Sequence, residues 1–169
     1  NLGISGGSNQ AQLKLVETAY SKYLESLPRP NFVIVVGDVN ATLAASRAAN
    51  RFKIPVAHIE AGLRSFDETM PEEFNRIETD KIANYHFASE PSAMANLERE
   101  GVNMDHVYLV GNIMLDTLVL NKQKAEYHTA LHDIGIDDKA FMLFSAHRPS
   151  NVDEKEDLVK IIKRVGTCL

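Results

Sequence analysis

The chain has 169 residues, enough for a domain with a substantial core, and it carries a net charge of −5 with an isoelectric point near 5.7. This acidic balance, together with the absence of a basic block, argues against a nucleic-acid partner. The longest apolar runs are the size of strands, and the first residues have neither a basic start nor an apolar segment, so we expect no membrane association and no signal peptide.

The single cysteine, Cys168, excludes an internal disulfide framework and favours a reducing compartment, so the predicted location is cytoplasmic. Its thiol follows an amphipathic helical pattern and is expected to be inert. The chain opens on Asn1 rather than Met, and it closes at Leu169 directly after a helical pattern. We therefore expect it to be a fragment of a longer protein.

Apolar residues at helical spacing alternate with short continuous apolar runs along the whole chain. The spacing predicts helices over 9–27, 42–52, 72–84, 91–100, 114–124 and 152–165, and strands over 32–36, 56–59, 85–88, 107–110 and 140–145. This alternation indicates an α/β fold with a parallel sheet that has helices on both faces. In the helix at 72–84, the shared face is expected to carry Phe74, Ile77, Lys81 and Ile82.

A polar, less regular stretch over residues 121–139 is the best candidate for a linker. The expected organisation is therefore a first domain over residues 1–120 and the truncated start of a second domain over residues 140–169.

Two acidic residues, Asp38 and Glu60, directly follow buried strands. Ligands of doubly wound sheets bind outside the carboxyl ends of the strands. A half-buried carboxylate at such a position is suited to general acid or base catalysis. The alternatives are that Asp38 or Asn40 caps the next helix, and that Glu60 is an exposed acid paired with Arg64.

Glu72 follows a proline near the start of a predicted helix, and two interpretations of it stay open. Thr69-Met-Pro-Glu72 has the pattern of a capping box, in which Glu72 reaches back to the cap. If the loop after Gly62 folds over the ligand edge of the sheet, Glu72 instead faces the ligand. Arg76 lies one turn further on, and this spacing permits an ion pair with Glu72.

His147 and Arg148 follow the predicted strand at 140–145 and precede a helix. A histidine and an arginine beside a helix N-terminus form a plausible cradle for phosphate. The alternative is that Asn151 simply caps that helix, with Glu154 at its third position.

No metal site or cofactor is predicted. His58 and His86 lie inside apolar strands and are expected to be core residues or to support a site, and neither has cysteine or aspartate partners at the spacing of metal ligands. No Gly-x-Gly-x-x-Gly sequence follows a strand and no Walker sequence occurs, so the nicotinamide, flavin and nucleotide-phosphate fingerprints are absent.

An ordered series of motifs resembles the UDP-N-acetylglucosamine 2-epimerase family. The series consists of Val36-Gly-Asp-Val-Asn-Ala-Thr42, Pro55-Val-Ala-His-Ile-Glu-Ala-Gly-Leu-Arg64, Pro71-Glu-Glu-Phe-Asn-Arg76, Val110-Gly-Asn-Ile-Met-Leu-Asp116 and the pair His147-Arg148. It runs over nearly the whole chain. The resemblance implies two Rossmann-like domains in the glycosyltransferase-B arrangement, with most of the first domain in this chain. The chain alone is then expected to be inactive.

The implied reaction is inversion of carbon 2 of a UDP-sugar by elimination and re-addition of UDP, without a cofactor, in a protein that is a homodimer at full length. Inversion requires an acid and a base on two sides of the sugar ring. The resemblance implies the following roles: Asp38, Glu60 and Glu72 as the acid/base set, Arg76 as the residue that orients them, and the catalytic His147 with Arg148 as contacts of the diphosphate.

Two departures from the family pattern leave the subtype open. Val39 stands where many members have threonine, and Pro-Ser-Asn-Val-Asp follows Arg148 in place of a second arginine and glutamate. The alternatives are a hydrolysing relative that releases N-acetylmannosamine, a relative that acts on a diacetamido uronic acid sugar, a glycosyltransferase of the same fold, and a non-catalytic sugar-nucleotide-binding domain. Three carboxylates at the ends of strands and at a helix start favour proton chemistry over transfer.

Overall fold

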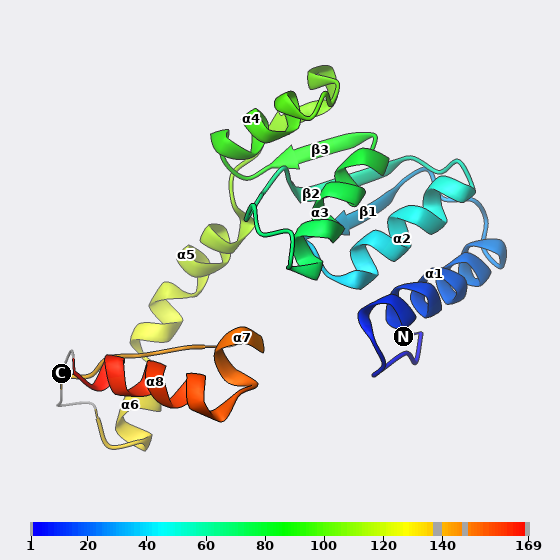
Figure 1. Cartoon of the computed structure of the whole chain (residues 1–169). Coiled ribbons are helices and arrows are strands. Elements are labelled where there is room, and N and C mark those ends of the chain that lie inside the picture. The colour runs from blue at the N-terminus through cyan, green and yellow to red at the C-terminus, as the bar shows by residue number, and fades with distance from the viewer. Residues whose placement is uncertain (1, 137–139, 147–148, 168–169) are drawn as a thin grey trace. The chain divides into compact units, whose positions relative to one another are not determined.

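A computed structural model of the chain describes residues 2–136, 140–146 and 149–167. Its elements in chain order are α1 (Asn9–Glu25), β1 (Val33–Val36), α2 (Asn40–Arg51), β2 (Val56–Ala61), α3 (Pro71–Ile82), β3 (Tyr85–Ala88), α4 (Pro91–Arg99), a 3₁₀ turn (Met104–His106), β4 (Val107–Leu109), α5 (Ile113–Glu126), α6 (Ala130–Asp133), α7 (Pro149–Val152) and α8 (Lys155–Gly166) (Figure 1). The chain divides into two compact units, Asn1–Asn121 and Lys122–Leu169, which are described separately. Within the described ranges, no helix has the length and apolar character needed to cross a membrane.

The first unit contains a four-stranded parallel sheet in the order β1-β2-β3-β4. One helix connects each strand to the next: α2 follows β1, α3 follows β2 and α4 follows β3. Because all strands run in the same direction, their carboxyl ends meet at one edge of the sheet. The predicted parallel sheet with flanking helices is confirmed.

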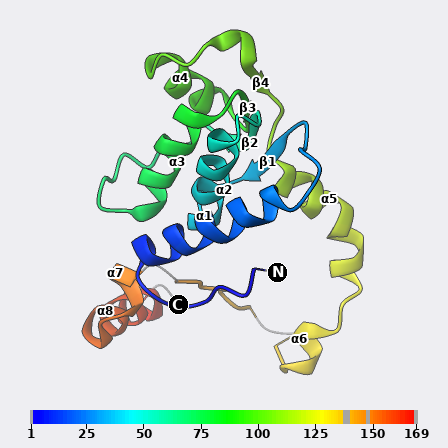
Figure 2. The same cartoon turned by 90° about the vertical axis from the view of Figure 1, so that its right-hand side faces the viewer.

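Helices α1 to α4 pack against one face of this sheet. Val33, Val35 and Val56 point to that face and form a buried cluster with Ala48 and Ala49 of α2. A second cluster on the same face contains Ala61, Leu97 and Val107. Figure 1 shows α2 and α3 in front of β1 and β2, and Figure 2, turned by 90°, shows these helices to one side of the strands.

The opposite face of the sheet carries the alternate side chains of each strand. Ile34 is 66% exposed and Val36 is 51% exposed, while the residues between and before them on β1 are buried. Tyr108 of β4, which lies in the same row as Val36, is also exposed. The four helices named above therefore cover only the other face of the sheet.

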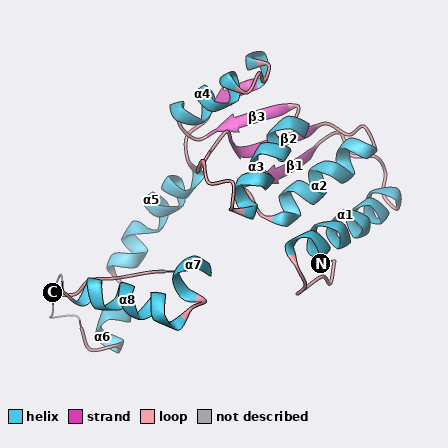
Figure 3. Cartoon of the chain, in the orientation of Figure 1, coloured by secondary structure: helices cyan, strands magenta, loops and turns pink. Residues whose placement is uncertain are grey.

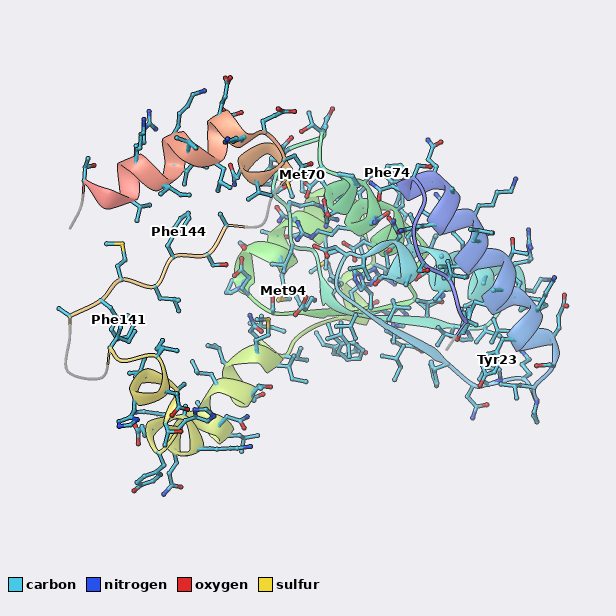
Figure 4. All side chains as sticks on the ribbon, turned by 90° about the horizontal axis from the view of Figure 1, so that it is seen from below. Tyr23, Met70, Phe74, Met94, Phe141 and Phe144 are labelled. Atoms are coloured by element: carbon cyan, nitrogen blue, oxygen red, sulfur yellow. The ribbon has the colours of Figure 1, made fainter. Side chains whose placement is uncertain are left out.

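Residues 140–146 of the second unit form no strand, so the strand predicted over 140–145 is wrong (Figure 3). Phe141 and Phe144 project from this irregular segment (Figure 4), and Leu143 is 88% exposed. A run of apolar residues becomes a strand only when its backbone groups pair with a neighbouring strand. No such neighbour occurs in the part of the chain that the structure describes.

The helix predicted over 152–165 corresponds to α8, which begins at Lys155. Glu154 is its N-cap residue and makes no side-chain capping bond, and Asn151 lies within the preceding α7. The alternative in which Asn151 caps this helix, with Glu154 at its third position, is therefore wrong. The stretch proposed as a linker begins within α5, which extends to Glu126, and it also contains the short helix α6.

Gly62 forms the tight turn after β2, and no other residue type fits there. Its φ is +79°, and a Cβ atom at this position would lie 2.3 Å from the carbonyl oxygen of Ala93. Its backbone N–H donates to Asp80 Oδ2 at 3.0 Å, and its carbonyl accepts from Asn96 Nδ2 at 2.9 Å. The turn therefore presses directly against α4 and is fixed from two helices.

The capping box predicted at the start of α3 is wrong. The helix begins at Pro71, and its N-cap is Met70, which makes no side-chain capping bond. Proline is favoured at the first helical position, so the residue before Pro71, and not Thr69, is the N-cap. Glu72 then falls at the second helical position, and its neighbour Glu73 takes the third.

Glu73 instead holds the loop that leads from β2 to α3. Its carboxylate accepts hydrogen bonds from the backbone N–H of Ser65 at 2.8 Å, from the Ser65 hydroxyl at 3.0 Å and from the backbone N–H of Phe66 at 3.0 Å. Burial raises the pKa of the Glu73 carboxyl, but these donors and the charge of Arg64 lower it by more, so its pKa lies below the usual value.

We expect Gly62→Ala to lower the free energy of unfolding by about 3 kcal/mol, because the new methyl group meets the backbone of α4 and the positive φ strains an alanine. Gly101→Ala is the matched control, since Gly101 has a φ of +80° but no atom within 4 Å of an added Cβ. It should cost about 1 kcal/mol. Urea denaturation followed by circular dichroism measures both, and equal losses would contradict the close approach.

We expect Glu73→Gln to lower the free energy of unfolding at pH 7 by about 2 kcal/mol, because a charged acceptor of three hydrogen bonds is lost. A carboxyl whose folded-state pKa is depressed stabilises the fold fully above its unfolded-state pKa, about 4.3 for glutamate. That contribution is lost as the pH falls through the folded-state pKa. The difference between the wild type and the variant should therefore shrink below about pH 4.

The control for this experiment is Glu72→Gln, which changes the neighbouring acid on the exposed side of α3. Denaturation curves recorded from pH 7 down to pH 3 should show little loss for this control. A loss in Glu73→Gln that stays constant over the whole pH range would rule out the assigned role of the carboxylate.

Candidate active site

The carboxyl ends of β1 and β2 bring the two acids of the sequence analysis to one edge of the sheet. Asp38 directly follows Gly37 at the end of β1, and Glu60 is the penultimate residue of β2. The backbone N–H of Gly37 donates to the carbonyl of Ile59 at 3.0 Å. An added Cβ at Gly37 would lie 3.4 Å from Glu60 Oε2. The Glu60 carboxylate therefore rests against the residue that precedes Asp38.

Glu60 has a strained backbone, with a φ of +68°. The register between β2 and β3 shifts at this point: Ile59 pairs with Phe87 and Ala61 with Ala88, so Glu60 is the extra residue of a β-bulge. A non-glycine residue at positive φ is uncommon and is concentrated at functional sites. Glu60 is half-buried, and its carboxylate forms no hydrogen bond or ion pair with another residue of the described ranges. The alternative pairing with Arg64 is not formed.

Asp38 is held from α3 rather than used as a cap. Its carboxylate forms an ion pair with Arg76, and its backbone carbonyl accepts from Asn75 Nδ2 at 2.9 Å. Helix α2 has Val39 as its N-cap and no side-chain capping bond, so the capping alternatives for Asp38 and Asn40 are wrong. The Asn40 side chain instead contacts Asn75, with 3.0 Å between its Oδ1 and the Asn75 Nδ2.

Arg76 therefore has a different partner from the one that its spacing suggested. Besides Asp38 it approaches Glu73, with 3.5 Å between Nη1 and Oε2, and it forms no ion pair with Glu72 among the described residues. Glu72 is exposed at the rim of a pocket of about 360 Å³ that is also lined by Asp38, Asn40, Pro71 and Asn75. The structure thus brings Glu72 and Asp38 to one pocket, and Glu60 does not line it.

Beneath this edge lies a buried ionic network that the sequence did not reveal. Asp80 of α3 is 2% exposed, and its carboxylate contacts His58 Nδ1 at 2.6 Å and Arg64 Nη2 at 2.8 Å. Arg64 also binds Glu100, with 2.7 Å between Nη2 and Oε2. Together with the N–H of Gly62, the network joins β2, the following turn, α3 and the end of α4.

The ionic partners in this network determine its charge state. Burial raises the pKa of Asp80, but the hydrogen bond and charge of His58 and the charge of Arg64 lower it by more, so its pKa lies below the usual value. For Arg64, burial lowers the pKa, while its bonds to Glu100 and Asp80 raise it above the usual value. Asp80 is therefore a carboxylate, and Arg64 is a guanidinium.

The buried side of α3 is polar, which corrects the face expected from apolar spacing. Its buried residues are Glu73, Asn75, Thr79 and Asp80. Phe74 is 53% exposed and lies on the side of α3 toward α1 (Figure 4), where it lines a pocket with Leu13. The signal for the missed residues was present: polar side chains at positions 73, 76 and 80 recur at helical spacing.

His147 and Arg148 lie outside the described residues. Within the described ranges, no group of three or more histidine, cysteine, aspartate and glutamate side chains is arranged to hold a metal ion. The geometry supports proton transfer: one carboxylate, Asp38, is fixed by a guanidinium, and a second, Glu60, lies without such a partner against the residue before it.

Comparison with known proteins identifies the family. The family model described as UDP-N-acetylglucosamine 2-epimerase matches residues 1–168. A UDP-N-acetylglucosamine 2-epimerase of Methanocaldococcus jannaschii is 40% identical over 169 residues, which cover 98% of this chain and 46% of that protein. A UDP-2,3-diacetamido-2,3-dideoxy-D-glucuronate 2-epimerase of Pseudomonas aeruginosa is 38% identical over 140 residues, or 82% of this chain and 38% of that protein.

Solved structures agree with the sequence comparison. The crystal structure of the M. jannaschii UDP-GlcNAc 2-epimerase in complex with UDP-GlcNAc and UDP is similar with a TM-score of 0.88 at 39% identity, and the match covers 99% of this chain and 46% of that one. The chain thus spans about half the length of the curated relatives it matches. On this evidence, the chain belongs to the UDP-N-acetylglucosamine 2-epimerase family of isomerases.

Proposed function

We propose that the protein to which this chain contributes interconverts UDP-N-acetylglucosamine and UDP-N-acetylmannosamine without net hydrolysis, supplying a precursor of cell-surface polysaccharides. The observation that carries this proposal is the pair of acids at Gly37, where Glu60 rests against the residue preceding Asp38. The family membership and the ligands named for the M. jannaschii structure support UDP-N-acetylglucosamine as the substrate.

In the proposed reaction, a carboxylate removes the proton from carbon 2 while the bond from carbon 1 to the UDP oxygen breaks. The products of this step are UDP and an unsaturated sugar with a double bond between carbons 1 and 2. UDP then adds back to carbon 1, and a proton is delivered to carbon 2 from the opposite face, so atoms and charges balance.

The acids of the described edge divide these tasks. Glu60, which lacks an ionic partner in the described ranges, is suited to exchange the carbon-2 proton. Asp38, oriented by Arg76, is assigned to the other face of the sugar. Glu72, exposed in the same pocket as Asp38, completes the set. His147 and Arg148 are proposed to contact the diphosphate, on the strength of their motif.

We propose the corresponding domain organisation as well: residues 1–120 as most of a first Rossmann-like domain, 121–139 as a linker region and 140–169 as the start of a second domain. The matched length of less than half of the relatives supports the further proposal that this chain alone is inactive. The family resemblance supports a homodimer of the full-length protein, and the single cysteine supports a cytoplasmic location.

The test uses the full-length protein that contains this chain, incubated with UDP-N-acetylglucosamine in deuterated water. We expect deuterium at carbon 2 of the product, detected by mass spectrometry and proton NMR. The nucleotide sugar UDP-N-acetylmannosamine should accumulate. Release of free N-acetylmannosamine with UDP would identify the hydrolysing subtype instead, and absence of deuterium at carbon 2 would exclude epimerisation.

Glu60→Gln should lower the rate of deuterium incorporation by about 10³-fold, because an amide cannot accept the carbon-2 proton. The control is Glu98→Gln, which changes an exposed acid on α4 and should leave the rate unchanged. A Glu60→Gln protein that retains the wild-type rate would remove Glu60 from the acid/base set.

A further inference from the structure

His58 is buried directly under the two candidate acids, and both of its ring nitrogens are engaged. The side chain is 0% exposed. Its Nδ1 lies 2.6 Å from Asp80 Oδ1, and its Nε2 lies 2.9 Å from the carbonyl oxygen of Gly37. The imidazole thus spans from α3 to the end of β1, although it belongs to β2.

Hydrogen-bond accounting fixes the proton on Nε2 of this ring. The Gly37 carbonyl can only accept, so Nε2 must carry a proton. Asp80 accepts from the N–H of Gly62 and from Arg64 at its Oδ2, which leaves its Oδ1 for the contact with His58 Nδ1. The ring therefore donates from Nε2 to Gly37 and is hydrogen-bonded to Asp80 through Nδ1.

Gly37 transmits this contact to the acids. Its N–H donates to Ile59 of β2, its carbonyl accepts from His58, and Glu60 Oε2 lies 3.4 Å from the position of an added Cβ. Gly37 has a φ of +67°, a backbone conformation that other residue types rarely adopt. Its contacts hold the turn in this conformation. Asp38 is the next residue, and a shift of the Gly37 peptide moves Asp38 and changes the wall on which Glu60 rests.

We propose that His58 is a positioning residue that fixes the separation of Asp38 and Glu60 by clamping the Gly37 carbonyl to the Asp80 carboxylate. This inference rests on the proposed function for its effect on catalysis. The clamp itself is a property of the fold. Small displacements of catalytic groups are costly, since a misplacement of about 1 Å can lower a rate by about 10²-fold.

The chain offers a matched control in the neighbouring strand. His86 pairs in register with His58, is 3% exposed and donates from Nε2 to the backbone carbonyl of Asp80 at 2.8 Å. It therefore has the same depth and touches the same helix residue. It makes no contact with Gly37, so it tests the cost of removing a buried histidine without disturbing the junction.

In the full-length protein, His58→Leu should lower kcat for epimerisation and for deuterium exchange by about 10- to 100-fold, with KM changed less than about threefold. His58→Gln, whose amide is able to donate to the Gly37 carbonyl, should recover part of the loss. His86→Leu should lose a comparable amount of thermal stability but keep its kcat. Equal losses of kcat in the two leucine variants would overturn the positioning role.

A second measurement needs no variant and no activity. Nitrogen-15 NMR of histidine-labelled protein should show a proton on Nε2 of His58. A ring whose Nε2 carries no proton would overturn the clamp even if the protein is an epimerase. Conversely, a protonated Nε2 in a protein without carbon-2 exchange would retain the clamp and refute the proposed function.

Discussion

The carboxylate of Asp80 is the interaction on which the candidate site depends. It accepts hydrogen bonds from His58 in β2, from the N–H of Gly62 in the turn and from Arg64 in the following loop. A buried charge is tolerated only when it is paired and fully hydrogen-bonded, and removal of one partner of such a pair typically costs about 3–5 kcal/mol. One residue of α3 therefore ties down three consecutive parts of the segment that carries Glu60.

The bulge at Glu60 explains how a polar side chain can end a buried strand. Along β2, Val56 and His58 point to the helix-covered face, so regular alternation would place Glu60 on that face too. The extra residue instead lets Ala61 pair with Ala88 and join the core cluster on that face. The Glu60 side chain therefore does not follow the alternation of faces along β2. The left-handed backbone at Glu60 costs about 1–2 kcal/mol.

Periodicity predicted the first unit well, because its helices and strands follow local patterns of apolar residues. The rule that ligands bind at the carboxyl ends of parallel strands also singled out Asp38 and Glu60 from their places after apolar runs. Contacts between residues that lie far apart in the sequence were not predicted. His58 and Asp80 are separated by 22 positions, and Arg76 and Asp38 by 38, so neither pair leaves a local signal.

Other errors have equally specific causes. The capping box failed because the helix begins at Pro71, one residue after the position that the pattern required. The polar face of α3 was overlooked because apolar spacing was assumed to mark the buried side. Residues 140–145 have the composition of a strand. A strand forms only beside a neighbouring strand, however, and local composition does not reveal whether such a neighbour is present.

The distribution of charge at this edge separates two chemical tasks. Asp38, Glu60 and Glu72 make the described edge anionic, and its nearest cations are already committed: Arg76 to Asp38, and Arg64 to Asp80 and Glu100. An edge of this kind is suited to exchange protons, yet it repels a diphosphate. The proposed reaction therefore requires cations from elsewhere in the protein to hold the leaving group. In the proposed reaction the leaving group is held by separate residues, and Glu60, which has no ionic partner in the described ranges, keeps its carboxylate for the carbon-2 proton.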